Sequence, residues 1–521
     1  MLRKVNNVIN SVTQGVISMP TKELFSGEPF FDGWKSKEYV FESEEAKSQF
    51  RLITNSQRGN WIDWDLYYLI KRLAPDLGLE KTELKGRAKY NPDMFRPHCR
   101  KWVEGQNRVI AYDTQAFALA NAKVRARFKL REKVQPIAFE EVPWKDDTNF
   151  GAPTFSNSKH YPNAQEKAIA GAKAVKRGKS PEPFTAYHRG KNGDEVRIVM
   201  AEPKEMFIIG GTYFYPFFEA LKLVKSPYAG STKRLAISAR MNNFKWNSRF
   251  ILAADYSKFD STIPPVIISC AFEIIKDNFI MTPAEEALWE KYVKHFMTNG
   301  VLMPDGRIYY GRRGGVPSGA IFTSVIGSIC NALLIEYACI CHDALLTDYL
   351  VLGDDCIIGL NAPFQKEEFA QYLRHFGIEV SLEDTELHKA EDYVYFLGHY
   401  WDDGVSKRPV KESVLRLVCP ENVKPWNRAK FGSYEYCIGL FDKIKDYQND
   451  NRDFWELGNR IMDALMYPEE ANFKWGTKFH RGFAYNNVVL DVKQKRKSGL
   501  KRALGETEEL KQHSTRLLTV Y

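Results

Sequence analysis

Two short apolar segments enclose a pair of aspartates in the second half of the chain, and this arrangement constrains the fold more than any other feature of the sequence. Residues 349–352 and 356–360 each have the length and composition of a buried strand. Between them lies Gly353-Asp354-Asp355. Two apolar strands around a Gly/Asp turn predict an antiparallel β-hairpin with carboxylates at its tip.

A further carboxylate also follows an apolar segment directly. Residues 250–254 form another apolar run of strand length, which ends in Asp255. A carboxylate at such a position is normally paired or bound to a metal ion, because an uncompensated buried charge is costly. If these strands lie side by side in one sheet, Asp255, Asp354 and Asp355 form a cluster of negative charge. Oxygen ligands without His or Cys favour Mg²⁺ or Mn²⁺ over zinc.

Between these two patterns lies another one. Residues 314–319 read Gly-Gly-Val-Pro-Ser-Gly, and Thr323 and then Asn331 follow in an uncharged stretch. A lone Gly-Asp-Asp is usually an ordinary turn, and aspartates spaced like Asp255 and Asp260 are frequent by chance. Finding all of these patterns in order within one short region is hard to assign to chance.

Taken together, the patterns resemble the palm motifs of viral RNA-dependent RNA polymerases, over roughly residues 249–401. The Val-Pro-Ser-Gly-x-x-x-Thr form and the chain length are most similar to polymerases of small double-stranded RNA viruses, of the picobirnavirus and partitivirus type. The resemblance implies an α+β right-hand fold, with an antiparallel palm sheet flanked by helices. We expect an N-terminal segment and fingers in residues 1–248, a palm in 249–409 with a fingers insertion near 263–312, and a thumb with a basic C-terminal tail in 410–521.

The resemblance also implies a role for each acidic residue. Asp255 and Asp354 would hold two metal ions, Mg²⁺ or, as a substitute, Mn²⁺, and Asp355 would be a more peripheral ligand. Asp260 is similar to the family's ribose-reading aspartate. It would accept a hydrogen bond from the 2′-OH of an NTP, directly or through Asn331 or the Ser of the Ser-Gly pair.

The remaining candidates would contact the NTP or the template. Ser318 and Gly319 resemble the flexible loop that positions template and ribose, and Thr323 would belong to the same site. Upstream, Arg197 is the candidate for the triphosphate contact, because a guanidinium binds phosphate through two parallel hydrogen bonds. The segment that contains Arg197 also has the pattern of a charged β-hairpin, and it is similar to the fingers motif that lines the NTP channel. Two further cations of this segment would be channel partners: Arg189 and Lys191.

Two departures from the family pattern affect individual assignments. Many related polymerases carry Asn four residues after the motif's Thr, where this chain has Gly327, and Asn331 lies one helical turn farther along the same face. The family often carries a Lys after the helix that follows the Gly-Asp-Asp hairpin, as general acid for the leaving pyrophosphate. The aligned residues here are Asp384-Thr385-Glu386, which leaves Lys389 or His388, or no acid at all, as alternatives.

The expected function is template-directed RNA synthesis from NTPs by two-metal nucleotidyl transfer, for replication and transcription of a viral, double-stranded RNA genome. Two alternatives stay open: a reverse transcriptase, and a noncatalytic RNA-binding replication scaffold on a polymerase fold. A reverse transcriptase typically carries an aromatic residue shortly after the metal-binding aspartate, whereas Asp260 and the Ser-Gly loop favour ribose selection. Clustered carboxylates that repel RNA argue against the scaffold.

Composition agrees with an RNA-binding enzyme without requiring one. The chain has 521 residues and a net charge of +9, from 74 Lys and Arg against 65 Asp and Glu. Its 8 cysteines show no CxxC spacing, which argues against a zinc ribbon or a disulfide framework. The uncharged residues 320–335 are shorter than a membrane span and predict a buried core helix.

The expected partners follow from the same reading. They are the RNA template and product, NTPs and a viral capsid protein. Lys and Arg contacts to phosphates would grip the RNA with little sequence readout. We expect a monomeric enzyme without a membrane span, located in the host cytoplasm within the virion or a viral replication particle.

Overall fold

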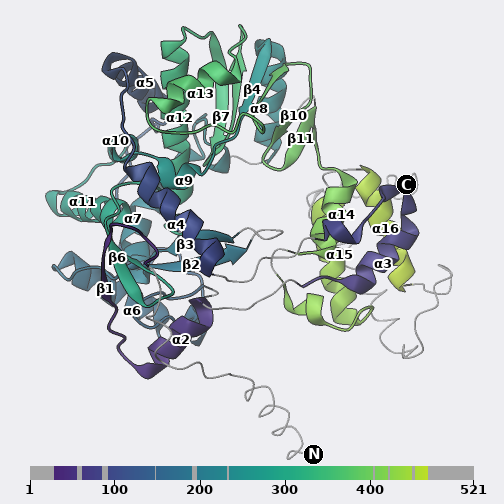
Figure 1. Ribbon diagram of the computed structural model, residues 1–521, viewed down its shortest axis with the longest axis horizontal. Helices are drawn as coiled ribbons and strands as arrows, with labels where there is room; N and C mark the ends of the chain where they lie inside the picture. The colour runs from purple at the N-terminus through teal and green to yellow at the C-terminus, as the bar shows by residue number, and fades with distance from the viewer. Residues whose placement is uncertain are drawn as a thin grey trace, which may run out of the picture. The chain divides into compact units, whose positions relative to one another are not determined.

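The computed structural model describes residues 29–54, 61–84, 92–146, 148–190, 196–231, 234–402, 405–420, 423–448 and 452–466 (Figure 1). The chain divides into two compact units. The first comprises Met1–Gln57, Tyr90–Arg189 and Val196–Asp392, and the second comprises Arg58–Lys89, Gly190–Glu195 and Tyr393–Tyr521. The first unit contains the expected palm motifs and is therefore the part that positions the site.

The helices and strands of the first unit have the following bounds, in chain order: β1 Lys35–Glu38, α2 Glu44–Thr54, α4 Pro92–Gln106, α5 Thr114–Arg127, η3 Phe139–Glu141, η4 Ser158–His160, α6 Ala164–Lys176, β2 Phe184–Gly190, β3 Val196–Ala201, α7 Lys204–Leu221, η5 Ala229–Ser231, α8 Arg234–Asn247, β4 Phe250–Ala254, α9 Phe259–Thr262, α10 Pro265–Lys276, α11 Pro283–Thr298, β5 Val301–Leu302, β6 Arg307–Tyr310, α12 Thr323–Cys341, β7 Leu346–Leu352, β8 Asp355–Leu360, α13 Lys366–Arg374 and β9 Glu386–Lys389. Those of the second unit are α3 Trp64–Leu73, η1 Pro75–Leu77, η2 Lys81–Glu83, β10 Val394–Phe396, β11 His399–Asp402, β12 Val405–Lys407, α14 Val410–Val418, η6 Pro425–Arg428, α15 Tyr434–Gln448 and α16 Arg452–Met466.

The sheet that carries the acidic motifs has four antiparallel strands in the order β7-β8-β4-β9. Strands β7 and β8 form the predicted hairpin, with Leu352 opposite Asp355, so that Gly353-Asp354 is a two-residue turn. Gly353 has φ +64, the left-handed region that glycine adopts without strain at the first position of a II′ turn. The hairpin prediction is confirmed.

Helix α12 forms the core behind this sheet. All its residues from Val325 to Cys339 are buried, and it packs against α5, α10, α13 and β7. It is long and apolar enough to cross a membrane, but 83% of its most apolar window is buried inside the protein. The predicted buried core helix is therefore confirmed. Figure 1 shows α12 and α13 beside the strands β4 and β7.

A second sheet of the first unit has five strands in the order β1-β6-β5-β2-β3. Strands β2 and β3 are neighbours in it, as the charged-hairpin pattern predicts. The segment expected as an insertion near residues 263–312 supplies β5 and β6 to this sheet, beside β2, and not to the sheet of the acidic motifs. The motifs around Arg197 and around Asp255 therefore begin in two different sheets.

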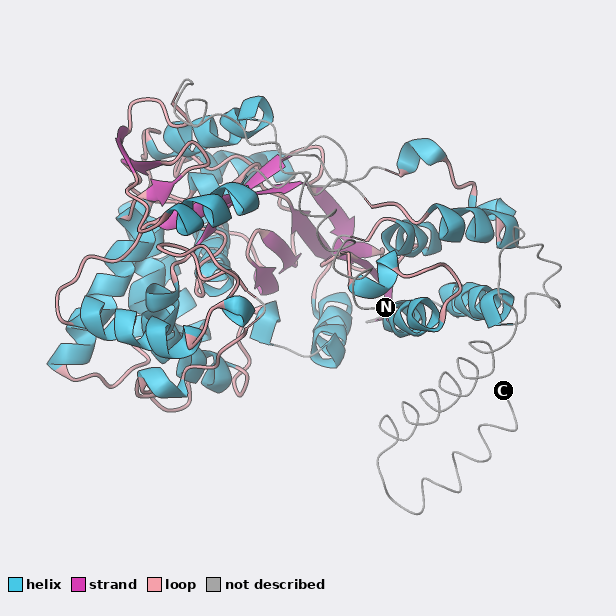
Figure 2. Ribbon diagram, turned by 90° about the horizontal axis from the view of Figure 1, so that it is seen from below, coloured by secondary structure: helices cyan, strands magenta, loops and turns pink. Residues whose placement is uncertain are grey.

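The second unit is built mainly from helices, as Figure 2 shows, with a small sheet in the order β10-β11-β12. Its core joins α3 to α14, α15 and α16, and Tyr436 donates a buried hydrogen bond to Asp63 (2.5 Å). Residues 58–89 thus group with the C-terminal part of the chain, as do β10 to β12 from within the expected palm range. The expected basic tail lies outside the described residues.

Candidate active site

The three acidic residues of the hairpin and of β4 lie at one end of the four-stranded sheet. Ala254 pairs with Cys356, so the same register places Asp255 beside Asp355. Desolvation by the surrounding protein, then the carboxylates of Asp354 and Asp255, raise the pKa of Asp355 to about 6. The three carboxylates therefore lie close enough to repel one another, as the sequence predicts.

The backbone of Asp255 is held from the side opposite the hairpin. Its N–H donates to Oγ1 of the buried Thr385 (3.1 Å), and its carbonyl accepts from the N–H of Ser381 (2.9 Å). Thr385 stands in the segment that aligns with the family's general acid. It supplies a structural hydroxyl there, a role that no residue pattern indicated.

Asn331 fixes the aspartate turn to helix α12. The side chain is fully buried, and its Nδ2 donates to the carbonyls of Gly353 (3.0 Å) and Asp354 (3.2 Å). Its Oδ1 accepts from the hydroxyl of Tyr256 (2.7 Å). One turn earlier on α12, Oγ of Ser328 accepts from the N–H of Gly353 (2.7 Å). Both N–H groups of the Asn331 amide are thus donated to the turn, and its expected role in reading the ribose stays a prediction.

Tyr256 follows Asp255 directly, the region where a reverse transcriptase would place an aromatic residue. Only 4% of Tyr256 is exposed, and its ring packs at 4.8 Å from that of Phe259. Because its hydroxyl donates to Asn331, Tyr256 helps to hold the amide that binds the Gly353-Asp354 turn. No sequence motif indicates these roles of Tyr256 and Ser328.

The Ser-Gly loop is attached to strand β3. Gly319 N–H donates to the carbonyl of Met200 (3.1 Å), and Ser318 Oγ donates to that of Ile198 (3.3 Å). A Cβ at Gly319 would stand 2.6 Å from the Met200 oxygen, so this approach requires glycine. Thr323 closes the loop through its hydroxyl, which lies 2.6 Å from the carbonyl of Pro317. The predicted grouping of Ser318, Gly319 and Thr323 in one loop agrees with these contacts.

Asp260 and Arg197 are brought together by this loop. The carbonyl of Asp260 accepts from Val316 N–H (2.7 Å), just before the Ser-Gly pair, and Arg197 stands on β3 one residue before Ile198. Burial and the carboxylate of Asp354 raise the pKa of Asp260 to about 7, and the exposed Arg197 partly counters this shift. Strand β3 and helix α9 thus place a cation and a carboxylate close enough to interact with each other, and the carboxylate of Asp260 close enough to interact with Asp354.

Two of the expected residues lie away from this group. Lys389 pairs with Phe250 at the opposite end of β4, five residues and about 16 Å from Asp255. His388, opposite Ile251, is engaged with Glu386 at 2.9 Å. The antiparallel direction of β9 therefore excludes both as a general acid at this site, a correction to the sequence analysis. Arg189 is exposed at the end of β2, and Lys191 lies outside the described residues.

The carboxylates do not form a complete metal cage. In the part of the chain that the structure describes, no group of three or more His, Cys, Asp or Glu side chains is close enough to hold one metal ion. Mg²⁺ is usually held by one or two carboxylates together with water and substrate phosphates, not by protein ligands alone. A set of carboxylate oxygens open to solvent fits a hard divalent cation whose coordination the substrate completes.

Comparison with known proteins agrees with this geometry. A family model described as viral RNA-dependent RNA polymerase matches residues 142–421, more than half of the chain. The chain is 30% identical over 210 residues to the RNA-directed RNA polymerase of Cryptosporidium parvum virus 1 (strain KSU-1), covering 38% of each protein. It is 25% identical over 403 residues to the potential RNA-dependent RNA polymerase of a human picobirnavirus, covering 74% of this chain and 66% of that one.

The fold is similar to that of a solved polymerase. The crystal structure of the RNA-dependent RNA polymerase of a human picobirnavirus superimposes with a TM-score of 0.63 at 16% sequence identity, over 82% of this chain and 89% of that one. The matched regions span 38% and 66% of the two relatives' own lengths. The predicted right-hand fold and the predicted resemblance are both confirmed. With its palm hairpin, Ser-Gly loop and fingers strand in place, the chain belongs to the viral RNA-dependent RNA polymerase family.

Proposed function

We propose that this chain synthesises RNA on an RNA template, and so replicates and transcribes a viral, double-stranded RNA genome. One observation carries the proposal: Asp255, Asp354 and Asp355 crowd together at one end of the palm sheet. Such crowding is unfavourable unless cations or substrate neutralise it, and it serves no purpose in a module that only binds RNA.

Polymerases of this family generally use divalent metal ions. We propose Mg²⁺, with Mn²⁺ as a substitute, held by Asp255 and Asp354 with Asp355 as a peripheral ligand. Bound there, the ions would raise the acidity of the 3′-OH and neutralise charge on the pyrophosphate leaving group. The open carboxylate set leaves coordination positions for the triphosphate.

The remaining residues would position the NTP. Arg197 is exposed on β3 next to Asp260, where a guanidinium is suited to the triphosphate. Asp260 would accept a hydrogen bond from the ribose 2′-OH, with Ser318 and Gly319 shaping the loop around it. Arg189 would add positive charge to the channel, and Lys191 is proposed for the same role from its position in the sequence.

The finer organisation is proposed on the sequence motifs. We propose an N-terminal segment and fingers in residues 1–248, a palm in 249–409 and a thumb with a basic tail in 410–521. We further propose a monomeric enzyme that contacts RNA, NTPs and a viral capsid protein, in the host cytoplasm within the virion or a replication particle. The Lys and Arg contacts to RNA phosphates would make binding strongly salt-dependent.

The test is extension of a primed RNA template by the purified chain with Mg²⁺, comparing NTPs with dNTPs. Asp354→Asn should lower the rate at least about a hundredfold, as expected when a group that stabilises developing charge is removed. Glu391→Gln, the same change at another exposed carboxylate of the first unit, should leave the rate unchanged. Extension by Asp354→Asn at the wild-type rate would refute the metal assignment.

The same assay decides between the alternatives. A preference for dNTPs would identify a reverse transcriptase. If the wild-type chain binds RNA but does not extend it with any nucleotide, the replication-scaffold alternative is correct and the proposal is wrong.

A further inference from the structure

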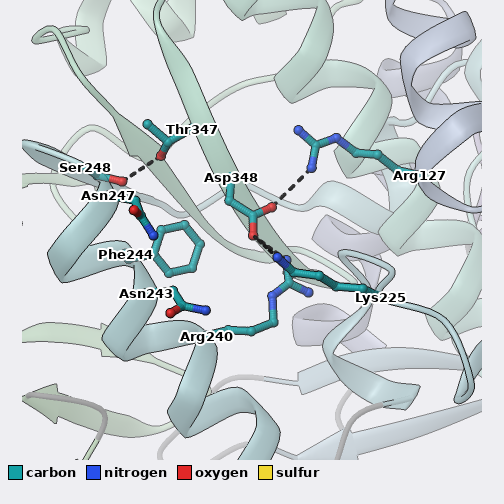
Figure 3. Close-up of a pocket in the computed structure, with 9 residues that line it drawn as sticks. All are labelled: Arg127, Lys225, Arg240, Asn243, Phe244, Asn247, Ser248, Thr347 and Asp348. Atoms are coloured by element: carbon teal, nitrogen blue, oxygen red, sulfur yellow. Dashed lines mark hydrogen bonds and ion pairs between the residues drawn. The ribbon is translucent and has the colours of Figure 1, made fainter.

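A polar cavity lies in the first unit, away from the aspartate turn. It has a volume of about 290 Å³ and is lined by Arg127, Lys225, Arg240, Asn243, Phe244, Asn247, Ser248, Thr347 and Asp348 (Figure 3). Asp348 stands near the start of β7, five residues before Gly353 and so about 16 Å along the strand. The cavity is therefore at the opposite end of β7 from the proposed catalytic residues.

Positive charge exceeds negative charge around this cavity. Asp348 pairs with Arg240 (3.0 Å) and Arg127 (3.1 Å), with Lys225 at 4.0 Å (Figure 3). Arg127 also pairs with the buried Glu336 (3.0 Å). In the described part of the chain, ion pairs join the following group: Lys123, Arg127, Lys225, Arg240, Glu336 and Asp348. Two positive charges are in excess, which favours an anionic ligand.

Arg240 is held rigidly at the cavity wall. It is only 8% exposed, and its guanidinium donates to the carbonyls of Ser226 (2.5 Å) and Tyr349 (3.0 Å) as well as to Asp348. Its Nε is buried without a hydrogen-bond partner among the described residues. A buried donor without a partner is costly, and a fixed guanidinium loses little side-chain entropy when it binds a phosphate.

The sheet is modified where it forms the cavity wall. The pairing of β7 with β8 shifts between Leu346 and Asp348, which leaves Thr347 as the extra residue of a β-bulge. In a regular strand Thr347 and Asp348 would point to opposite faces, whereas both line this cavity. The bulge therefore re-aims a side chain, which is a common use of bulges at binding sites.

The residue facing this bulge is Gly359, in the middle of strand β8. A Cβ at Gly359 would lie 2.5 Å from the hydroxyl oxygens of Ser248 and Thr347 and 2.6 Å from the ring of Phe244. Glycine inside a strand weakens it and often marks a site of close approach. Three lining residues thus occupy the space that a side chain at position 359 would take. The cavity wall therefore requires glycine at this position.

We propose that this cavity binds a phosphate-bearing small molecule, of the pyrophosphate or nucleotide class. Arg240, Arg127 and the exposed Lys225 would neutralise the phosphates, and the exposed amides of Asn243 and Asn247 would donate further hydrogen bonds. A volume of about 290 Å³ is at the lower limit for small-ligand sites. The cavity is half open and lined by residues from a few helix and strand ends, and its small volume favours a small ligand over a continuous RNA chain.

The test is calorimetric binding of pyrophosphate and of ATP to the full chain in EDTA. Without divalent ions, the carboxylates of the catalytic end repel both ligands, so binding there is suppressed. The wild-type chain should still bind, and Lys225→Glu should weaken binding at least about tenfold, since a charge-assisted contact is replaced by a repulsion. Lys225 is 73% exposed at its side chain, so this variant should fold normally.

Three further variants sharpen the result. Lys222→Glu, an equal charge reversal three residues away at a lysine paired with Glu219, should leave binding unchanged. Asp348→Asn should tighten binding, because the carboxylate of Asp348 would no longer neutralise the three cations that line the cavity. Equal affinity for both ligands would assign the site to phosphate alone, whereas tighter ATP binding that Asn243→Ala abolishes would assign it to a nucleotide.

Three results would overturn the proposal. One is the absence of any binding of pyrophosphate or ATP in EDTA. Another is an equal loss of affinity in Lys225→Glu and Lys222→Glu, which would show only a general effect of net charge. The last is a loss of binding of a short RNA in Lys225→Glu with pyrophosphate binding unchanged, which would identify an RNA contact surface.

Discussion

Removing the amide of Asn331 should misplace the catalytic turn without altering sugar selection. Asn331→Ala deletes two hydrogen bonds to the turn carbonyls of Gly353 and Asp354 and leaves the hydroxyl of Tyr256 without its acceptor. The side chain of Asn331 is fully buried, so water cannot replace these hydrogen bonds. A buried hydrogen bond contributes roughly 1 kcal/mol, and a buried group left unsatisfied costs about 1–3 kcal/mol, so the loss of stability should be about 2–4 kcal/mol.

A matched control separates stability from positioning. Asn278 is also buried and makes three side-chain hydrogen bonds, to Leu130 N–H (2.8 Å) and to the carbonyls of Ile274 (2.9 Å) and Phe128 (3.3 Å). None of these partners belongs to the aspartate turn. Asn278→Ala should therefore lose a similar amount of stability, measured by urea unfolding, while its rate of nucleotide incorporation stays near that of the wild type.

The kinetic result distinguishes two roles for Asn331. If its amide fixes the turn, Asn331→Ala should lower kcat by about tenfold to a hundredfold, because a small misplacement of reacting groups has a large effect. NTPs and dNTPs should be affected equally. The reasoning is refuted if kcat matches that of Asn278→Ala, or if the variant instead loses its preference for NTPs, as the ribose-reading role would require.

Two further predictions concern the loop and Asp260. Gly319→Ala should lower the rate of nucleotide incorporation strongly while the α12 core stays folded, because a Cβ there would stand 2.6 Å from the Met200 oxygen and push the loop from β3. A folded variant that incorporates nucleotides at the wild-type rate would contradict this. Because burial and Asp354 raise the pKa of Asp260 from 3.8 to about 7, the folded chain disfavours its ionised form, and the stability of the metal-free protein should fall as pH rises through this range. Asp260→Asn should make urea stability less dependent on pH between these values, and an unchanged slope would show that another group is responsible.

The sequence predicted those parts of the fold that local patterns determine. The hairpin around Gly353 and the buried helix α12 depend on an apolar period and on turn chemistry, which are both visible in a short window. The end of the sheet where Asp255 meets Asp355 was also predictable, since both carboxylates directly follow or precede buried strands. The only further requirement is that β4 and β8 pair in the register that places Asp255 beside Asp355.

Assignments that depend on the direction or partners of distant strands were less predictable. Lys389 is close to the aligned position in sequence, but β9 runs antiparallel to β4, so each residue past Thr385 lies farther from Asp255. Thr385, Tyr256 and Ser328 act through single hydrogen bonds to backbone or to a buried amide. Such contacts leave no periodic pattern in the sequence, which is why they were missed.

Gly327 and Asn331 are best understood as one feature. The position where many relatives carry Asn is Gly327 here, and a Cβ on it would lie 3.4 Å from Cα of Gly353. With no side chain at 327, the aspartate turn lies directly on α12, within reach of Ser328 on one side and of Asn331 one turn farther along. The amide is therefore used for holding the catalytic turn, and any reading of the ribose by an amide at 327 is absent. Under the proposed function we therefore expect Asp260 and the loop at Ser318 to provide the selection of NTPs, with Asp260 as the main determinant of sugar discrimination.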